Sequence, residues 1–106
     1  MNEEISKTKL LGMLGLATKA RQTAIGIDCI TDKIRLGNKV QTVIIAVDAA
    51  QNSKKRLVNC CTYYNVSYFV SHLTQSELSH AVGKISDISA VAILDRNFSD
   101  AIKKLV

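Results

Sequence analysis

The chain has 106 residues, of which 47% are hydrophobic and 22% charged, the proportions of an ordinary globular protein. This length predicts one domain over residues 1–106, with a core that needs no disulfide or metal to support it. A formal net charge of +5 favours an anionic partner such as nucleic acid, whereas the lack of an apolar run of ~18 residues argues against a membrane-spanning segment and a membrane partner.

The first forty residues predict a helix, a short edge strand and a second helix. The first helix covers about residues 4–20, and residues 22–25 form the strand. The second helix begins at Gly26 and stops at Gly37 and Asn38. Apolar side chains at helical spacing define one face of each helix: Leu10, Met13, Leu14 and Ala17 in the first, and Ile27, Ile30 and Ile34 in the second.

Two strand–helix units follow along the chain. Residues 43–47 form an apolar, β-branched run that is typical of a strand covered on both faces. The next helix ends at Asn65, and residues 68–70 form another strand. The side chains that we expect to face the core from this helix are Leu57, Cys60, Cys61 and Tyr64.

A capping box at Thr74 and Glu77 predicts the start of a fourth helix, which closes at Gly83. Leu73 and Leu78 fit the hydrophobic staple that accompanies such a start. Residues 88–94 predict the last strand, and a final helix follows with Asn97 as its cap. Alternating helices and strands predict an α/β protein, a three-layer α/β/α sandwich with a mixed four-stranded sheet.

The three cysteines, Cys29, Cys60 and Cys61, indicate reduced thiols and a cytoplasmic location. Their number is odd, no CxxC pair is present, and adjacent cysteines have poor geometry for a disulfide. No zinc-ligand pattern occurs, so we expect neither a metal nor another cofactor. The N-terminal residues lack the basic start and apolar core of a signal peptide.

Signals for catalysis are weak. His72 and His80 have no obvious nucleophile or metal partner in the sequence. Asp48 and Asp95 each follow a buried strand, as phospho-acceptor acids do, but we expect them to cap turns or helices. We therefore expect a protein that is not an enzyme and has no small-molecule substrate.

The start of the second helix is the most informative point in the sequence. Backbone N–H groups are exposed where a helix begins, so Gly26 could hold an anion such as an RNA phosphate. Asp28 and Asp32 oppose an anion there, although an acid near a helix start also stabilises the helix. Lysines and arginine at positions 54–56 oppose the dipole of the third helix, so they either face solvent or meet an anionic partner.

We expect the aromatic side chains to lie mostly on core faces, which argues against a base-stacking platform. They are Tyr63, Tyr64, Tyr68, Phe69 and Phe98.

Several segments in order resemble one known family over nearly the whole chain. They are residues 14–21, the helix between Gly26 and Gly37, and residues 43–48, 53–56, 61–66 and 77–84. The chain resembles the ribosomal protein L7Ae/L30e superfamily, and within it the small YlxQ-type proteins of Gram-positive bacteria. The resemblance implies an α/β/α sandwich that binds kink-turn RNA through the start of the second helix and through a loop before the capping-box helix.

Carried over to this chain, the implied contacts at the helix start are Gly26, Asp28, Cys29 and Asp32, and those in the loop are Leu73, Thr74 and Gln75. The chain departs from the family pattern at several of these positions. Asp28 replaces an asparagine, Cys29 a glutamate and Asp32 a lysine, which adds negative charge near phosphates. Gln75 stands where relatives have a basic residue, and Ser79 where they have a glycine.

The leading hypothesis is therefore a monomeric protein that recognises structured, kink-turn-like RNA, including ribosomal RNA. Lys19, Arg21 and Lys33 would supply flanking positive charge. The alternative is a protein-interaction or regulatory module on the same fold with weakened RNA binding, in which Asp28→Asn with Asp32→Lys would restore affinity for RNA. A third class is a small enzyme or phospho-acceptor domain that uses Asp48 or Asp95.

Overall fold

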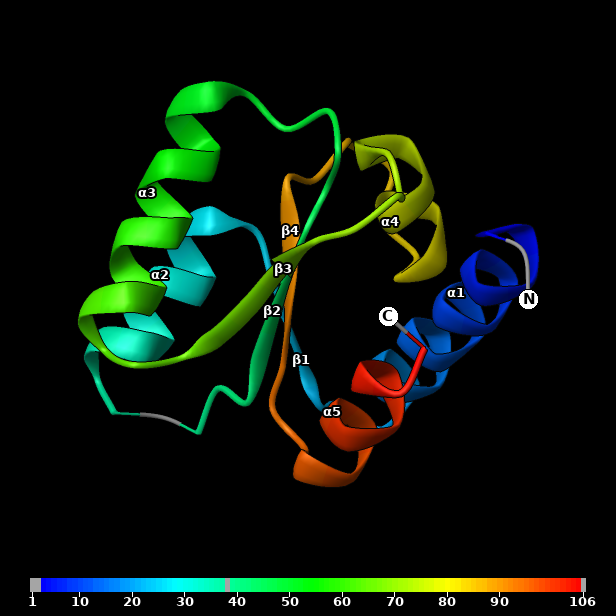
Figure 1. The fold of residues 1–106 in the computed structure, drawn as a ribbon, viewed down its shortest axis with the longest axis horizontal. Coiled ribbons are helices and arrows are strands. Elements are labelled where there is room, and N and C mark those ends of the chain that lie inside the picture. Colours follow the sequence, from blue (N-terminus) through cyan, green and yellow to red (C-terminus); the bar gives the residue numbers. More distant parts are fainter. Residues whose placement is uncertain (1–2, 38, 106) are drawn as a thin grey trace.

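The computed structural model describes residues 3–37 and 39–105, which place one sheet between two layers of helices (Figure 1). The strands β1 (Thr23–Ile25), β4 (Ala90–Ile93), β2 (Thr42–Ile45) and β3 (Ser67–Val70) lie side by side in that order. β2 pairs with β3 in parallel, while β4 runs antiparallel to both β1 and β2. The prediction of a mixed four-stranded sheet in an α/β/α sandwich is confirmed.

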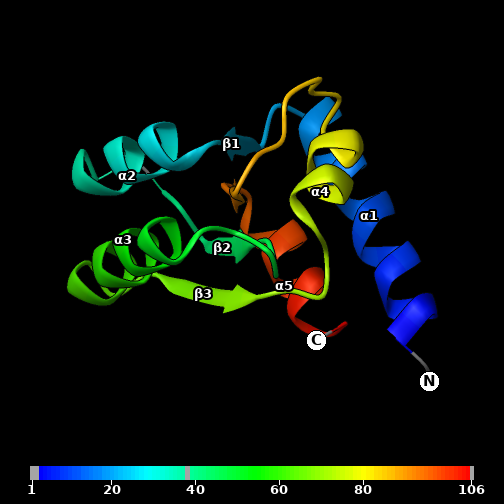
Figure 2. The same cartoon turned by 90° about the horizontal axis from the view of Figure 1, so that it is seen from above.

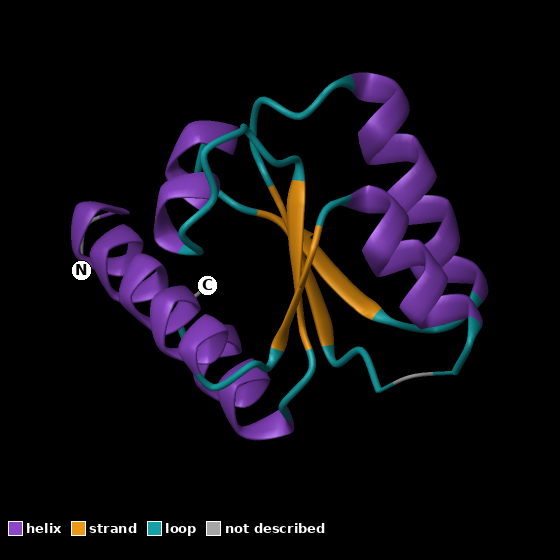
Figure 3. Ribbon diagram, turned by 180° about the vertical axis from the view of Figure 1, so that it is seen from behind, coloured by secondary structure: helices purple, strands orange, loops and turns teal. Residues whose placement is uncertain are grey.

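The helices divide between the two faces of the sheet. α2 (Ile27–Arg35) and α3 (Gln51–Tyr63) cover one face, and α1 (Glu3–Lys19), α4 (Gln75–Ala81) and α5 (Arg96–Lys103) cover the other (Figure 2). The view from behind shows the same separation, with the strands enclosed between the helices (Figure 3). Amphipathic periodicity explains this arrangement, because each helix turns its apolar face inward.

The two central strands form the middle of the core. Every residue of β2 and β4 is buried, because each strand has a neighbour on both sides and helices on both faces. The buried polar side chains include one pair of hydroxyls, in which Oγ1 of Thr42 and Oγ of Ser99 lie 2.6 Å apart. Thr42 also donates to the carbonyl of Gln41, so both hydroxyls have partners.

The expectation that the aromatic residues lie mostly on core faces is wrong for the tyrosines. Tyr63 is 82% exposed, and Tyr64 and Tyr68 are 41% and 40% exposed. β3 is an edge strand with three exposed positions out of four, and the last turn of α3 extends beside it at this flank. Tyr64 continues the helical spacing of Leu57 and Cys61, but it is the C-cap of α3 beside an edge strand, where no further strand covers it.

The helix ends match the predicted positions, with one correction. Asn65 adopts a left-handed φ of 59° after α3, and the N–H of Val66 donates to the carbonyl of Cys61. The N-cap of α5 is Asp95, not Asn97, because the carboxylate of Asp95 accepts the N–H of Asn97 at 2.9 Å. Asn38, predicted with Gly37 as a helix stop, lies outside the described residues.

Strand direction gives the molecule two distinct ends. β1 and β2 run antiparallel to β4, and β3 runs parallel to β2. The carboxyl ends of β1, β2 and β3 therefore meet at one end of the sheet. α2, α3 and α4 begin there, and we call it the helix-start end. At the opposite end β1, β2 and β3 begin and β4 finishes, and we call this the strand-start end.

Candidate nucleic-acid interface

The start of α2 is open to a ligand at the helix-start end. Gly26 is the N-cap with φ 90° and ψ 152°, and no side chain caps the helix. The carbonyl of Gly26 accepts the N–H of Ile30, and its own N–H donates to the carbonyl of Ala90. The N–H groups of the first turn therefore point outward without a side-chain acceptor, as in helix ends that bind phosphate.

A shallow groove adjoins this helix start. It has a volume of about 380 Å³ and is lined from two segments, by residues 25–26 and by residues 83–86 with Ile88. Ile85 is fully exposed at this groove, where its neighbours Lys84 and Ser86 are also exposed. An apolar side chain without cover, next to a cation and free N–H groups, suits a ligand with both a planar apolar part and a phosphate, such as a nucleotide.

Both acids of α2 are paired within the protein. The carboxylate of Asp28 accepts a hydrogen bond of 2.8 Å from Nη2 of Arg56, which reaches across from α3. Asp32 lies 3.5 Å from Arg35 one turn along the same helix. The pairing with Arg56 offsets the negative charge of Asp28 beside the α2 start, so the acid is less unfavourable to an anion than the sequence alone indicates.

The side chains of the loop before α4 and of the first α4 residue make contacts within the protein. Leu73 is fully buried, so its side chain offers no surface to a base. The hydroxyl of Thr74 accepts the N–H of Glu77 and completes the capping box with that residue. Gln75 donates through its N–H and its Nε2 to Asp48. Contacts from this loop would have to come from its main chain or from the outer edge of Gln75.

The structure does not bring all of the predicted contact residues together. Gly26, Asp28 and Cys29 share the start of α2, and Cys29 is exposed there. Lys33 lies in the last turn of α2, roughly 9 Å along the helix axis. Lys19 and Arg21 lie at the strand-start end, because α1 finishes there and β1 begins. They lie at the other end of β1 from Gly26, so the predicted contact residues are divided between two ends of the protein.

The basic start of α3 is also explained in part by internal contacts. Nζ of Lys54 donates to the carbonyl of Val47 at 2.8 Å, and Arg56 is held by Asp28. Lys55 is exposed and has no ion-pair partner among the described residues. The sequence left two alternatives for the cations at positions 54–56, exposure to solvent or contact with an anionic partner. Lys55 is the one of the three whose side chain is available for either.

The acids considered for chemistry have capping roles. Asp48 accepts the first N–H of α4 from Gln75, and Asp95 caps α5. Within residues 3–37 and 39–105 no group of three His, Cys, Asp or Glu side chains could hold a metal ion. None of the helices in that part of the chain is long and apolar enough to cross a bilayer.

The three thiols differ in environment. Burial, with a smaller effect of the neighbouring Cys60, raises the pKa of Cys61 to about 11. Burial also raises the pKa of Cys60, while Arg35 and Arg56 oppose that change. Cys29 is exposed beside the α2 start, so it is the accessible thiol among the three.

Sequence reasoning missed the segment of residues 84–86 that completes the groove. It treated this stretch as a join between the helix that closes at Gly83 and the following strand. A signal was available, because Ile85 is an isolated apolar residue among Lys84, Ser86 and Asp87 and has no place in the periodicity of either element.

Known proteins resemble this chain in sequence over most of its length. The chain is 30% identical to "RNA-binding protein YlxQ" of Bacillus subtilis over 94 residues, which cover 89% of this chain and 91% of that protein. It is 29% identical to the protein of the same name from Enterococcus faecium over 106 residues, covering 100% and 98% of the two chains.

Solved structures agree with this placement. A protein of unknown function from Bacillus halodurans has a TM-score of 0.83 and 31% identity, with 92% of this chain and 95% of that one covered. The 15.5kD RNA binding protein of Giardia lamblia has a TM-score of 0.74 at 20% identity, covering 100% of this chain and 93% of that one, and shows the shared fold. The profile of the ribosomal protein L7Ae/L30e/S12e/Gadd45 family matches residues 8–103, and the chain belongs to that family.

Proposed function

We propose that the protein binds structured RNA at the helix-start end, and that it recognises a sharply bent, kink-turn-like element. The observation that carries the proposal is the uncapped start of α2 beside a groove with a fully exposed Ile85. The names of its relatives from Bacillus subtilis and Enterococcus faecium support RNA as the class of ligand.

The proposed mechanism separates positioning from recognition. N–H groups of the first α2 turn, with Lys84 and Lys55, hold phosphates on the two sides of the bend. Ile85 packs against a base that the bend turns out of its stack, because single, unstacked bases are what proteins read in RNA. A straight duplex offers no such base and would keep only the phosphate contacts.

We further propose that the chain acts as a monomeric, single-domain, non-enzymatic protein of the cytoplasm, with ribosomal RNA as one source of its ligand. The capping roles of Asp48 and Asp95 support a binding role over a phospho-acceptor role. The basic composition supports an RNA partner.

The test is a titration of a kink-turn hairpin and of a straight duplex of equal length, each at about 50 and about 200 mM salt. Tighter binding to the hairpin at both salt concentrations supports recognition of the bend. Equal affinity for the two RNAs would leave only general phosphate binding, and no binding to either RNA at the lower salt would overturn the proposal.

A second candidate is the protein-interaction module, and one observation favours it. Tyr63, Tyr68 and Val70 are exposed at the β3 edge of the sheet, where apolar side chains suit contact with another protein. This reading predicts a chain that binds no RNA until Asp28→Asn and Asp32→Lys are introduced together. The same titration with that double variant therefore distinguishes the two functions.

A further inference from the structure

Several cations without an ion-pair partner in the described regions lie away from the proposed RNA interface. At the helix-start end, Lys7 pairs with Glu77, Arg56 pairs with Asp28, and Lys54 donates to a carbonyl. At the strand-start end, four cations lie within four residues of the start of β1, the start of β2 or the end of β4: Lys19, Arg21, Lys39 and Arg96. None of the four forms an ion pair in the described part of the chain.

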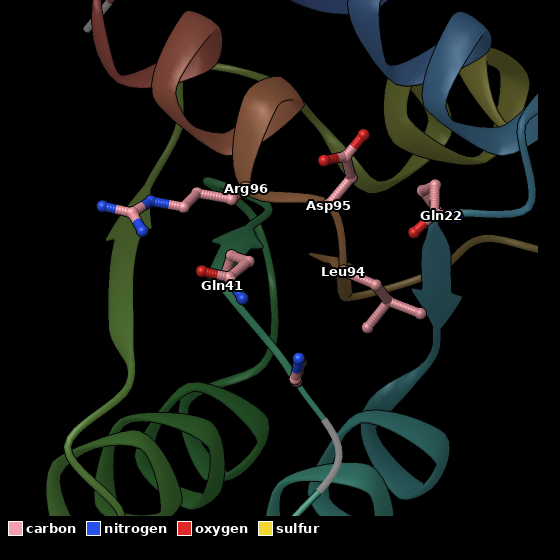
Figure 4. Close-up of a pocket in the computed structure, with 6 residues that line it drawn as sticks. Gln22, Gln41, Leu94, Asp95 and Arg96 are labelled. Carbon is pink, nitrogen blue, oxygen red and sulfur yellow. The ribbon is translucent and has the colours of Figure 1, made fainter.

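Two of these cations, Lys39 and Arg96, line an open groove with a volume of about 740 Å³, and Arg21 precedes Gln22, another lining residue. It is lined by Gln22, Lys39, Gln41, Leu94, Asp95 and Arg96. Figure 4 shows Gln22 and Gln41 at the starts of their two strands, with Arg96 extending outward from the start of α5, away from Asp95. Neither glutamine side chain hydrogen-bonds another described residue, so both amides are open to a ligand.

The one acid that lines this groove is already engaged. The carboxylate of Asp95 accepts the N–H of Asn97 and caps α5, so part of its charge is compensated by the helix start. Net charge around the groove remains positive, because Lys39 and Arg96 have no comparable partner in the described chain.

Local structure does not account for Arg96, which is the first residue of α5, where a positive charge opposes the helix dipole. Arg21 has a φ of 60° because it follows the end of α1, where its N–H donates to the carbonyl of Thr18 and the N–H of Gln22 donates to that of Ala17. Lys19 is different, because a cation in the last turn of α1 suits the dipole without any partner.

We propose that Arg21, Lys39 and Arg96, with the amides of Gln22 and Gln41, form a second RNA-binding surface that holds the phosphate backbone of another segment of the bound RNA. The surface lies at the strand-start end, opposite the α2 interface, so one RNA would contact both ends of the protein. The proposal goes beyond recognition of a bend and depends on the proposed function only for the class of partner.

The form of the surface favours a polymer backbone over a single free anion. Its cations come from three different connections of the fold, and two of them, Lys39 and Arg96, line an open groove. An open surface with cations on separate connections can hold phosphates along a strand, whereas a site for one phosphate ion encloses it with converging donors. The amides of Gln22 and Gln41 can bond 2′-hydroxyls, which distinguish RNA from DNA.

The test compares two double variants that remove the same charge. Lys39→Gln with Arg96→Gln alters the surface, and Lys9→Gln with Lys104→Gln alters exposed cations elsewhere. Each is titrated over a range of salt concentrations with two RNAs, a hairpin that ends just beyond the kink and the same hairpin with a long duplex arm. All four side chains are exposed, and thermal unfolding checks that both variants fold.

On the long-armed RNA we expect the Lys39 and Arg96 variant to lower the magnitude of the salt slope by about two, one for each lost phosphate contact, and to weaken binding more than tenfold at low salt. The control variant should bind like the wild type, and both variants should bind the short hairpin like the wild type. Equal salt slopes for the two variants on the long-armed RNA would overturn the proposal.

Two further measurements distinguish an error in the α2 interface from an error in the second surface. If the short hairpin does not bind the wild type, the proposed α2 interface is wrong, and the slope difference on plain duplex RNA still decides whether the second surface exists. If inorganic phosphate at millimolar concentration displaces the duplex arm as effectively as competing RNA does, the groove is a site for a free anion and the RNA assignment is overturned.

Discussion

Arg56 on α3 holds the carboxylate of Asp28, in the first turn of α2, through a hydrogen bond of 2.8 Å between Nη2 and Oδ1. Two helices that are separated by a strand in the sequence are thus joined at the point where we propose that RNA binds. Both side chains are largely exposed, so the pair contributes less than about 1 kcal/mol to folding. Its main consequence is electrostatic, because it neutralises one acid and one cation beside the α2 start.

Asp28→Asn is therefore expected to tighten RNA binding. It removes one negative charge from the interface and leaves Arg56 able to meet a phosphate, which should increase the magnitude of the salt slope by about one. The measurement is a salt-dependent titration with the kink-turn hairpin. Asp100→Asn, an exposed acid on α5, is the matched control and should change neither quantity. Weaker binding by Asp28→Asn would instead identify the carboxylate as a contact or as the group that positions Arg56.

Ile85→Ser should weaken binding to the hairpin while leaving the fold intact. The side chain is fully exposed, so its loss should change the free energy of unfolding by less than about 0.5 kcal/mol. Burying an isoleucine against a base is worth ~1.5–3 kcal/mol, which corresponds to roughly 10- to 150-fold in affinity. Leu36→Ser, an exposed leucine after α2, is the control. Equal affinities for the two variants would remove Ile85 from the interface.

The cysteines should react with iodoacetamide in the order of their exposure. At pH 8 we expect Cys29 to be alkylated first, while Cys61 is protected by burial and by a pKa of about 11. Peptide mass spectrometry over time follows each thiol separately, and denaturant should make all three react alike. Bound hairpin should slow alkylation of Cys29, since this residue lies beside the proposed contacts. Cys61 reacting as fast as Cys29 in the native protein would contradict the assigned burial.

The capping box of α4 should make part of the stability depend on pH. Nζ of Lys7 lies 2.6 Å from Oε2 of Glu77, and this hydrogen bond, with that from the N–H of Thr74, holds the pKa of Glu77 below its ordinary value of 4.5. Because the folded-state pKa is lowered, the carboxylate stabilises the fold fully above pH 4.5, and this contribution is lost as the pH falls through the lowered pKa.

Urea unfolding of the wild type and Glu77→Gln at pH 7 and at pH 3 measures this effect. The amide keeps the acceptor of the capping box and does not titrate, so the stability difference between the two proteins should be larger at pH 7 than at pH 3. A difference that is independent of pH would show that the charge of Glu77 is not the source.

The buried hydroxyls of Thr42 and Ser99 should behave as a coupled pair. Thr42→Val leaves the hydroxyl of Ser99 buried without its partner, which costs about 1–3 kcal/mol of unfolding free energy. Adding Ser99→Ala removes that unsatisfied group and should restore part of the loss. Denaturant unfolding of the two single variants and the double variant gives the coupling energy, and strictly additive effects would mean that the two hydroxyls do not depend on each other.

The order of the elements could be read from the sequence because each depends on local patterns. The β-branched runs predict β2 and β4, and the capping box at Thr74 and Glu77 predicts the start of α4. The order of the strands in the sheet is not local information. Nothing in residues 88–94 alone indicates that β4 runs between β1 and β2 and antiparallel to both.

The same limit explains what sequence reasoning missed in the site. Lys19 and Arg21 are close to Gly26 along the chain, yet β1 carries the chain from one end of the sheet to the other between them. Ile85 is far from Gly26 in the sequence, yet both line one groove, because the connection after α4 leads to the start of β4 at the helix-start end. Which residues lie close together in a sheet protein depends on the direction of each strand. A single sequence does not show at which end of the sheet a given residue lies.

The backbone conformation of Gly26 restricts which residues can replace it, although a replacing side chain would meet no steric clash. A Cβ atom added there would meet no atom within 4 Å, so the position has room for a side chain. Its φ of 90° is nevertheless a conformation that L-residues rarely adopt. Scans that score clashes or lost contacts would therefore rate Gly26→Ala as harmless, whereas a deep mutational survey should find this codon intolerant, because the chain would have to alter its path before α2 begins.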